Sequence, residues 1–126
     1  MTPQRVLIVE DEPACAATLE LALEGLRGIV SLRARTAEAA MEELGRFPVA
    51  VIITDIHLPA MSGLELMQWV HQMQPGVPVV VVSASTAASA KGDALQAGAA
   101  AFFAKPFSPA AVCQKMLELL KESSDV

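Results

Sequence analysis

The chain has 126 residues, of which 53% are hydrophobic and 18% are charged, and its formal net charge is −5 at pH 7. These values suit a soluble, well-packed chain and exclude a disordered one, and no apolar run approaches the roughly 20 residues of a membrane-spanning helix. The basic residues are scattered singly, so we expect no direct binding to nucleic acid and no membrane association.

The length and the start of the chain lead to expectations about domains and location. One domain over residues 1–126 is expected, with a core over 5–121 and a frayed tail over 122–126. The first residues lack the long apolar segment of a signal peptide, which favours a cytoplasmic location. Cys15 and Cys113 lack the spacing of a metal site, so we interpret both as small buried hydrophobic residues.

Apolar periodicity predicts two strands and two helices in the first part of the chain. Residues 6–9 form a short β-branched run that is typical of a buried strand, and residues 14–26 carry leucines at helical spacing. Residues 29–35 alternate apolar and polar side chains, which favours a strand at the outside of a sheet. Thr36 is a suitable N-cap for a helix over 37–47.

The central stretch contains the most informative change from apolar to polar residues. Residues 49–53 predict a strand buried on both faces, and Asp55 follows close behind its end. Pro59 and Gly63 mark a loop, because neither suits the continuation of a strand. Apolar side chains at helical spacing then predict a helix over 63–73. A carboxylate at the end of a buried strand is where open α/β sheets place their chemistry.

The last part of the chain predicts two further strands and two helices. Residues 79–82 are consecutive valines, which predict a strand that ends at Ser83. An alanine-rich helix with a weak amphipathic pattern is expected over 87–97, followed by a short strand over 99–104. Ser108 suits the N-cap of the final helix. The apolar stripe of that helix consists of Val112, Met116, Leu119 and Leu120.

The alternation of predicted strands and helices indicates the fold class. We expect an α/β fold with a doubly wound, five-stranded parallel sheet and five helices on both faces. Five strands suit the flavodoxin-like order 2-1-3-4-5 better than a six-stranded dinucleotide-binding fold. In that order the switch point lies between the first and third strands. These strands end in Glu10-Asp11 and Asp55.

Polar side chains follow every predicted strand except the outer second one. Because parallel strands place their carboxyl ends at one edge, these side chains should converge there although they are distant in sequence. Close carboxylates repel unless a cation joins them, and oxygen ligands at an open edge favour Mg²⁺. Mg²⁺, a lysine and a hydroxyl group suit phosphoryl transfer to an aspartate nucleophile. The converging residues are Glu10, Asp11, Ser83, Lys105 and the nucleophile, Asp55.

Each of these residues has a simpler interpretation when it is considered alone. The acidic run that contains Glu10 could serve the dipole of the following helix. Ser83 could be only a cap, and Lys105 only a solvated strand end. The placement of all of them at strand ends on one edge favours a shared site.

A family resemblance rests on several motifs of this kind. The chain resembles the receiver domain of two-component response regulators over essentially its whole length. The resemblance implies a receiver domain over residues 1–126 that accepts a phosphoryl group on Asp55 from a histidine kinase or a histidine phosphotransfer protein. The motifs that carry the resemblance are Glu10-Asp11, the segment from Asp55 to Gly63, Ser83-Ala84 and Lys105-Pro106.

The resemblance also implies a set of metal ligands. Asp11 and Asp55 would bind Mg²⁺ directly, and Glu10 would bind it mainly through water. The backbone carbonyl of His57 would complete the protein ligands, so the imidazole of His57 need not be one. We interpret the His57 side chain as exposed, and we place His71 at the surface of its helix.

Further implied roles concern the phosphoryl group and the switch. Ser83 would hydrogen bond to the phosphoryl group, Lys105 would pair with it, and Pro106 would follow a cis peptide bond. Phe102 stands where the family has an aromatic switch residue that is often tyrosine, so a signal must pass through packing and not through a hydroxyl group. Ser83 replaces the more common threonine and keeps the hydroxyl group.

These implications form one hypothesis with two alternatives. We expect a phosphorylation-dependent switch in which Ser83 and Phe102 repack. The repacking would change the partner affinity of the face made by the helix at 87–97, the strand at 99–104 and the final helix, through which a homodimer or an effector would bind. A phosphohydrolase of the haloacid-dehalogenase type is one alternative, although His57 stands where a second aspartate is normally needed. A phosphorylation-independent interaction module is the other.

Overall fold

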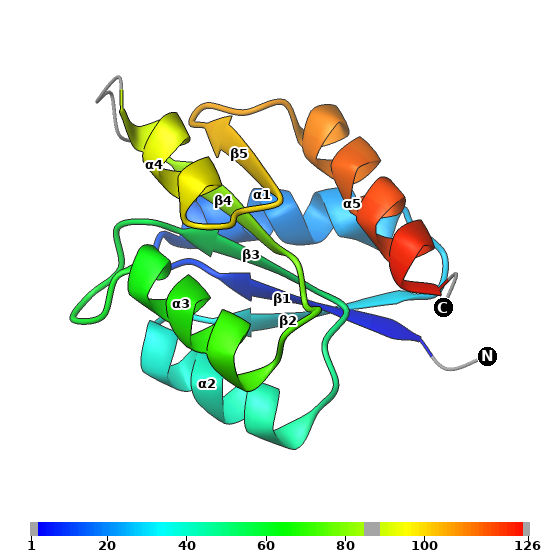
Figure 1. The fold of residues 1–126 in the computed structure, drawn as a ribbon. Helices are drawn as coiled ribbons and strands as arrows, with labels where there is room; N and C mark the ends of the chain where they lie inside the picture. The colour runs from blue at the N-terminus through cyan, green and yellow to red at the C-terminus, as the bar shows by residue number, and fades with distance from the viewer. Residues whose placement is uncertain (1–2, 85–88, 125–126) are drawn as a thin grey trace.

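The computed structural model describes residues 3–84 and 89–124, and the elements below lie within these ranges. The strands are β1 (Gln4–Val9), β2 (Ile29–Ala34), β3 (Val51–Asp55), β4 (Val79–Ser83) and β5 (Ala101–Ala104). The helices are α1 (Pro13–Glu24), α2 (Ala37–Arg46), α3 (Gly63–Met73), α4 (Ala90–Gln96) and α5 (Pro109–Ser124). Strands and helices alternate along the chain, as the apolar periodicity predicts (Figure 1).

The sheet has the expected topology. Its strands follow the order β2-β1-β3-β4-β5, and each neighbouring pair is parallel. The chain therefore reverses its direction of winding between β1 and β3, which creates the switch point of a flavodoxin-like sheet. The predicted α/β class and strand order are confirmed.

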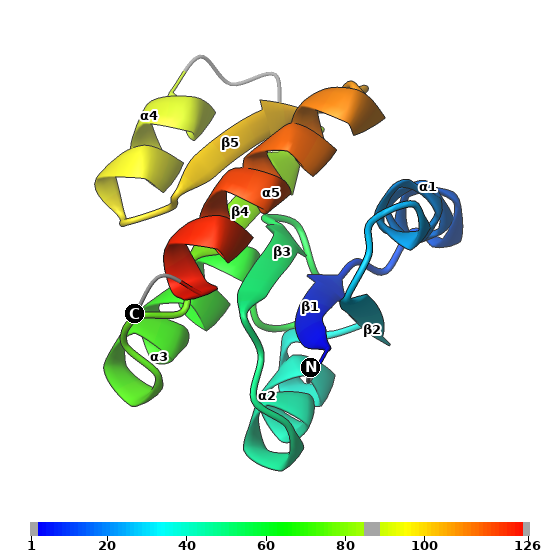
Figure 2. The same ribbon diagram turned by 90° about the vertical axis from the view of Figure 1, so that its right-hand side faces the viewer.

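Two hydrophobic cores cover the two faces of this sheet, because successive side chains of a strand point to opposite faces. In β1, Leu7 and Val9 join the core that α2, α3 and the Ala94 methyl group of α4 cover. Val6 and Ile8 join the core that α1 and α5 cover. Figure 2 shows α1 and α5 on one side of the sheet and α2 and α3 on the other. Burial on both faces explains why the central strands are almost entirely apolar.

Several element boundaries differ from the sequence prediction. β3 begins at Val51 and includes Asp55, because its ladder with β4 continues to the pair Asp55 and Val82. Asp55 is therefore held by strand pairing and does not lie in a loop. α1 ends at Glu24, where the prediction continues to residue 26.

The predicted fourth helix and the predicted tail also differ from the structure. α4 covers only Ala90–Gln96, and residues 87 and 88 of the expected helix lie outside the described residues. α5 continues to Ser124, so the tail that was expected over 122–126 is at least partly helical. Residues 125–126 lie outside the described part of the chain.

Hydroxyl groups cap three of the helices. Thr36 Oγ1 accepts a hydrogen bond from Ala39 N at 3.0 Å, and Ser108 Oγ accepts one from Ala111 N at 3.2 Å, as predicted for both caps. Ser62 forms a capping box with Glu65 at the start of α3. Among the described residues, no helix is both long and apolar enough to span a bilayer.

Candidate functional site

The carboxyl ends of β1, β3, β4 and β5 meet at one edge of the sheet. In the strand ladders Asp55 lies opposite Val82, and Ser83 lies opposite Ala104. The backbone N–H of Lys105 then donates to the Ser83 carbonyl oxygen at 2.8 Å. The fold therefore brings together residues that are far apart in the sequence, as the topology predicts.

Lys105 joins two acidic residues at this edge. Its Nζ atom lies 2.5 Å from Glu10 Oε1 and 2.9 Å from Asp55 Oδ2. Glu10 is fully buried, and Asp55 is 5% exposed. Lys105 is thus a largely buried, doubly paired ammonium group, which contradicts its interpretation as a solvated strand end.

Both oxygens of the Asp55 carboxylate accept hydrogen bonds. Oδ2 accepts from Lys105, and Oδ1 accepts from the backbone N–H of His57 at 3.1 Å. These two bonds fix the plane of the carboxylate at the end of β3. The His57 side chain itself is exposed, as expected.

The three predicted acidic residues form one cluster. Glu10, Asp11 and Asp55 each offer a carboxylate oxygen, and these oxygens all lie within 4.8 Å of one another. Asp11 is the most exposed of the three. The cluster has three carboxyl groups, and Lys105 pairs with two of them, Glu10 and Asp55, so acidic groups outnumber the ammonium group. An oxygen-only set of this kind fits a hard divalent cation, and it does not fit a soft metal.

The pKa values of Glu10 and Lys105 are both raised in this cluster. Burial is the largest influence on Glu10 and raises its pKa, while hydrogen bonds from Cys15 and Lys105 act in the opposite direction. Burial alone would lower the pKa of Lys105. Its hydrogen bonds to Glu10 and Asp55 outweigh burial and raise that pKa above its ordinary value. Lys105 therefore carries a full positive charge at neutral pH.

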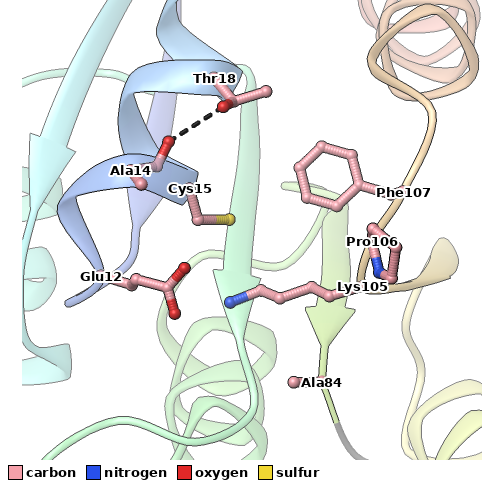
Figure 3. A pocket seen from close by; sticks show the side chains of 8 residues that line it. All are labelled: Glu12, Ala14, Cys15, Thr18, Ala84, Lys105, Pro106 and Phe107. Atoms are coloured by element: carbon pink, nitrogen blue, oxygen red, sulfur yellow. Dashed lines mark hydrogen bonds between the residues drawn. The ribbon is translucent and has the colours of Figure 1, made fainter.

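A cavity of about 430 Å³ opens beside Lys105, between the start of α1 and the segment that follows β5. Figure 3 shows the ammonium group of Lys105 and the thiol of Cys15 pointing into this space. Phe107 and Pro106 form an apolar wall, and Glu12 lies at the opposite side. Lys105 therefore lines the cavity and also contacts two members of the acidic cluster.

Both cysteines are free thiols, and Cys15 is buried as expected. Cys113 is only partly buried, and its thiol donates to the Ala22 carbonyl oxygen across the contact between α5 and α1. Burial and a hydrogen bond to Glu10 raise the pKa of the Cys15 thiol to about 12. Sequence spacing shows none of these contacts, because each joins residues of different elements.

The raised pKa predicts that Cys15 reacts very slowly with thiol reagents in the native protein. Compared with the ordinary value of 9.0, a pKa of about 12 leaves about a thousandfold less thiolate at pH 8. A Cys113→Ala variant, which keeps only Cys15, should therefore react with Ellman's reagent at least about a hundredfold more slowly when folded than in guanidinium chloride. Equal reaction rates in the folded and the unfolded protein would show that the Cys15 thiol is neither buried nor hydrogen-bonded.

The loop after β3 depends on Gly63 because of a close backbone contact. A Cβ atom at Gly63 would lie 2.0 Å from the Asp55 carbonyl oxygen. The Gly63 N–H also donates to the Ile56 carbonyl oxygen at 2.8 Å, and Ala60 adopts a positive φ of 63°. The sequence marks Gly63 only as the end of a loop, so its contact with the site residue was missed.

Ser83 and Phe102 lie on the same face of the sheet. Phe102 is half-buried, pairs with Val81, and packs against the core that α2, α3 and α4 cover. Ser83 lies two residues beyond Val81 and shares this face by strand alternation, and it is fully buried at the end of β4. The peptide bond between Lys105 and Pro106 is cis, at the proline where the sequence analysis expects one.

The expectation that His71 lies at the surface is met only in part. His71 is half-buried, and its ring lies against Gly98 in the turn between α4 and β5. The helical pattern of α3 places His71 beside the apolar stripe, but it gives no sign of a neighbour that is 27 positions away in the sequence.

The sequence matches the family of response regulator receiver domains over residues 6–117. The chain belongs to this family. Receiver domains are phosphoacceptor switches and not turnover enzymes, so the haloacid-dehalogenase alternative is set aside. The acidic cluster is consistent with the metal site of a receiver domain. Membership also implies a cognate kinase as a partner.

Two relatives of this receiver domain are longer proteins. The response regulator protein PilR of Pseudomonas aeruginosa is 39% identical over 106 residues, which are 84% of this chain and 24% of PilR. The transcriptional regulatory protein TcrX of Mycobacterium tuberculosis is 31% identical over 121 residues, which are 96% of this chain and 51% of TcrX. The chain thus spans about a quarter of PilR and about half of TcrX.

A solved receiver domain has the same fold. The response regulator receiver domain protein from Methanospirillum hungatei, described as CheY-like, superposes with a TM-score of 0.88 at 29% identity. The comparison covers 98% of this chain and 98% of that chain. The strand order and helix arrangement are therefore those of a receiver domain throughout the described residues.

Proposed function

We propose that this domain is a phosphorylation-dependent signalling switch whose phosphoacceptor is Asp55. The observation that carries the proposal is the position of the Lys105 ammonium group between Glu10 and Asp55, beside the acidic cluster. Asp55 is 5% exposed and is held by two hydrogen bonds, so one geometry is presented to an incoming phosphoryl group. A histidine kinase or a histidine phosphotransfer protein supplies that group.

The transfer exchanges one bond to phosphorus for another. A carboxylate oxygen of Asp55 forms a bond to phosphorus while the bond from phosphorus to the donor histidine nitrogen breaks. The imidazole nitrogen keeps the electron pair and takes a proton from water. Lys105 balances negative charge on the phosphoryl oxygens, and the Ser83 hydroxyl group donates a hydrogen bond to one of them.

Asp11 and Asp55 hold Mg²⁺ directly in this proposal, Glu10 holds it through water, and the His57 backbone carbonyl completes the set. The oxygen-only cluster supports this assignment. Bound Mg²⁺ supplies positive charge next to the phosphoryl oxygens. Lys105 positions Asp55 by direct contact, and Glu10 does so through the ammonium group that the two carboxylates share.

The switch consists of Ser83 and Phe102. When Ser83 turns toward the phosphoryl group, space opens on the sheet face that it shares with Phe102, and the ring repacks. The ring comes from β5, so repacking changes the surface of α4, β5 and α5. A homodimer or an effector binds this surface. Phe102 carries the signal by packing, because phenylalanine has no hydroxyl group.

We also propose the extent of the domain and its location in the cell. Residues 1–126 form one receiver domain in the cytoplasm, without direct contact to nucleic acid or membrane. A net charge of −5 supports the absence of nucleic-acid binding. Any output activity belongs to another domain or to a partner.

Incubation with acetyl phosphate and Mg²⁺ tests the chemistry. Intact mass spectrometry should show one added phosphoryl group on the parent, none after Asp55→Asn, and none when EDTA removes the cation. Asp93→Asn is the matched control, since Asp93 is an exposed aspartate of α4 and should leave phosphorylation unchanged. Equal incorporation in Asp55→Asn and parent would refute the assignment of Asp55.

A further inference from the structure

The imidazole of His71 packs directly on the backbone of Gly98. A Cβ atom at Gly98 would lie 2.6 Å from His71 Cε1 and 3.2 Å from Nδ1. Gly98 also has a φ of +108°, which side-chain-bearing residues rarely adopt. The backbone conformation therefore favours glycine at position 98, and a Cβ atom there would also force the histidine ring to move.

The contact joins α3 to the turn that follows α4, which is a short helix. α4 has seven residues, and its buried residue is Ala94, which contributes only a methyl group to the core. Ser89 makes no side-chain cap at the start of the helix. At the other end, Ala99 N–H donates to the Ala94 carbonyl oxygen at 3.0 Å, which closes the turn that contains Gly98. The Gly98 N–H also donates to the Leu95 carbonyl oxygen at 3.1 Å, and Ala97 and Ala99 pack against the core. The His71 ring adds a contact from α3 to these interactions.

We propose that the His71 ring is a stop against which the turn between α4 and β5 rests, and that this contact holds α4 in the position it has while Asp55 is unmodified. α4 forms part of the surface that changes in the proposed switch, so the regulatory half of this inference rests on the proposed function. The regulatory half of the proposal is that this contact is made in the unmodified arrangement and lost in the phosphorylated one, so that removing the ring favours the phosphorylated arrangement.

Amide hydrogen exchange of the unphosphorylated protein tests the anchor. In His71→Ala the amides of residues 90–97 should exchange at least about threefold faster than in the parent, while those of β3 stay unchanged. Gln72→Ala is the matched control, because Gln72 is the next residue of α3 and is exposed. His71→Phe keeps a ring at this position and should restore slow exchange. Unchanged exchange in His71→Ala would overturn the anchor.

Glycine substitutions test the same contact from the other side. Gly98→Ala should lower the Tm more than Gly76→Ala, because Gly76 has a similar φ of +101° but no atom within 4 Å of the added Cβ. In the His71→Ala background the ring is absent, so Gly98→Ala should lower the Tm no more than Gly76→Ala does. An excess that persists there would show that the clash does not involve His71, and it would overturn the contact.

The phosphorylation rate tests the regulatory half. With acetyl phosphate and Mg²⁺, His71→Ala should be phosphorylated severalfold faster than the parent and Gln72→Ala. Faster exchange with an unchanged rate would overturn the regulatory role and leave a structural anchor. A parent that accepts no phosphoryl group would refute the proposed function, and with it the regulatory role, while hydrogen exchange would still decide whether the ring holds α4.

Discussion

Replacing Lys105 by methionine should destabilise the fold by about 3–5 kcal/mol, because the fully buried Glu10 then loses its ammonium partner. Methionine has a similar length and cannot donate a hydrogen bond, so the packing changes little while the charge is lost. Urea unfolding measures the change in free energy. Phosphorylation of Asp55 should also become far slower, since Lys105 contacts its carboxylate directly.

The loss of unfolding free energy in Lys105→Met should depend on pH. Burial already raises the pKa of Glu10 above its ordinary value of 4.5, and the substitution removes a hydrogen bond that opposes this rise. Between the unfolded and the raised folded pKa, the folded state binds more protons than the unfolded state, so stability falls as pH rises through that window. The difference between variant and parent should therefore be smaller at pH 5 than at pH 8.

Two further variants test whether the loss of stability comes from the buried ion pair or from removing any lysine. Lys115→Met removes an exposed pair with Glu118 at 3.4 Å and should change stability by no more than about 0.5 kcal/mol. Adding Glu10→Gln to Lys105→Met removes the unpaired charge and should recover part of the loss. Similar losses in Lys105→Met and Lys115→Met would show that the buried pairs have no special importance.

Gly63→Ala should have the second large effect, a loss of about 3 kcal/mol in unfolding free energy. The added methyl group would lie 2.0 Å from the Asp55 carbonyl oxygen and 3.0 Å from Ile56 Cα, and both are backbone atoms that no rotamer change can move. The loop must shift and take Asp55 with it. A shift of about 1 Å is enough to slow phosphorylation by about a hundredfold.

Gly45→Ala is the control for the Gly63 substitution. Gly45 lies in α2 with no atom within 4 Å of an added Cβ, so alanine should stabilise the protein by about 0.5–1 kcal/mol. The two substitutions are chemically identical and are expected to act in opposite directions. A Gly63→Ala protein with the stability and phosphorylation rate of the parent would contradict the close contact.

The fold could be predicted from the sequence because its signals are local and repeated. The run Val79–Ser83 is buried over its whole length, and the stripe of α5 is buried as expected. The edge of the sheet was also predictable, since strand order alone brings Glu10, Asp55 and Lys105 together. α4 was harder to delimit because its alanines give little amphipathic contrast.

The missed features are contacts between elements. The ring of His71 on Gly98 and the clash distance at Gly63 depend on tertiary distances, and periodicity in one helix contains no information about them. The burial of Cys15 was predicted from the sequence. Its hydrogen bond to Glu10 could be seen only in the folded structure. A positive φ at a single glycine leaves no distinctive pattern in neighbouring residues.

All of the proposed chemistry uses one edge of the sheet, so the turns at the opposite edge lie away from it. Gly28 and Gly76 lie in such turns, before β2 and β4, and nothing lies within 4 Å of a Cβ atom at either position. Short peptide tags or fluorescent reporters could be inserted there without touching the acidic cluster, because exposed turn tips accept insertions well. Reporters at these two turns would leave the surface of α4, β5 and α5 uncovered for partner-binding measurements.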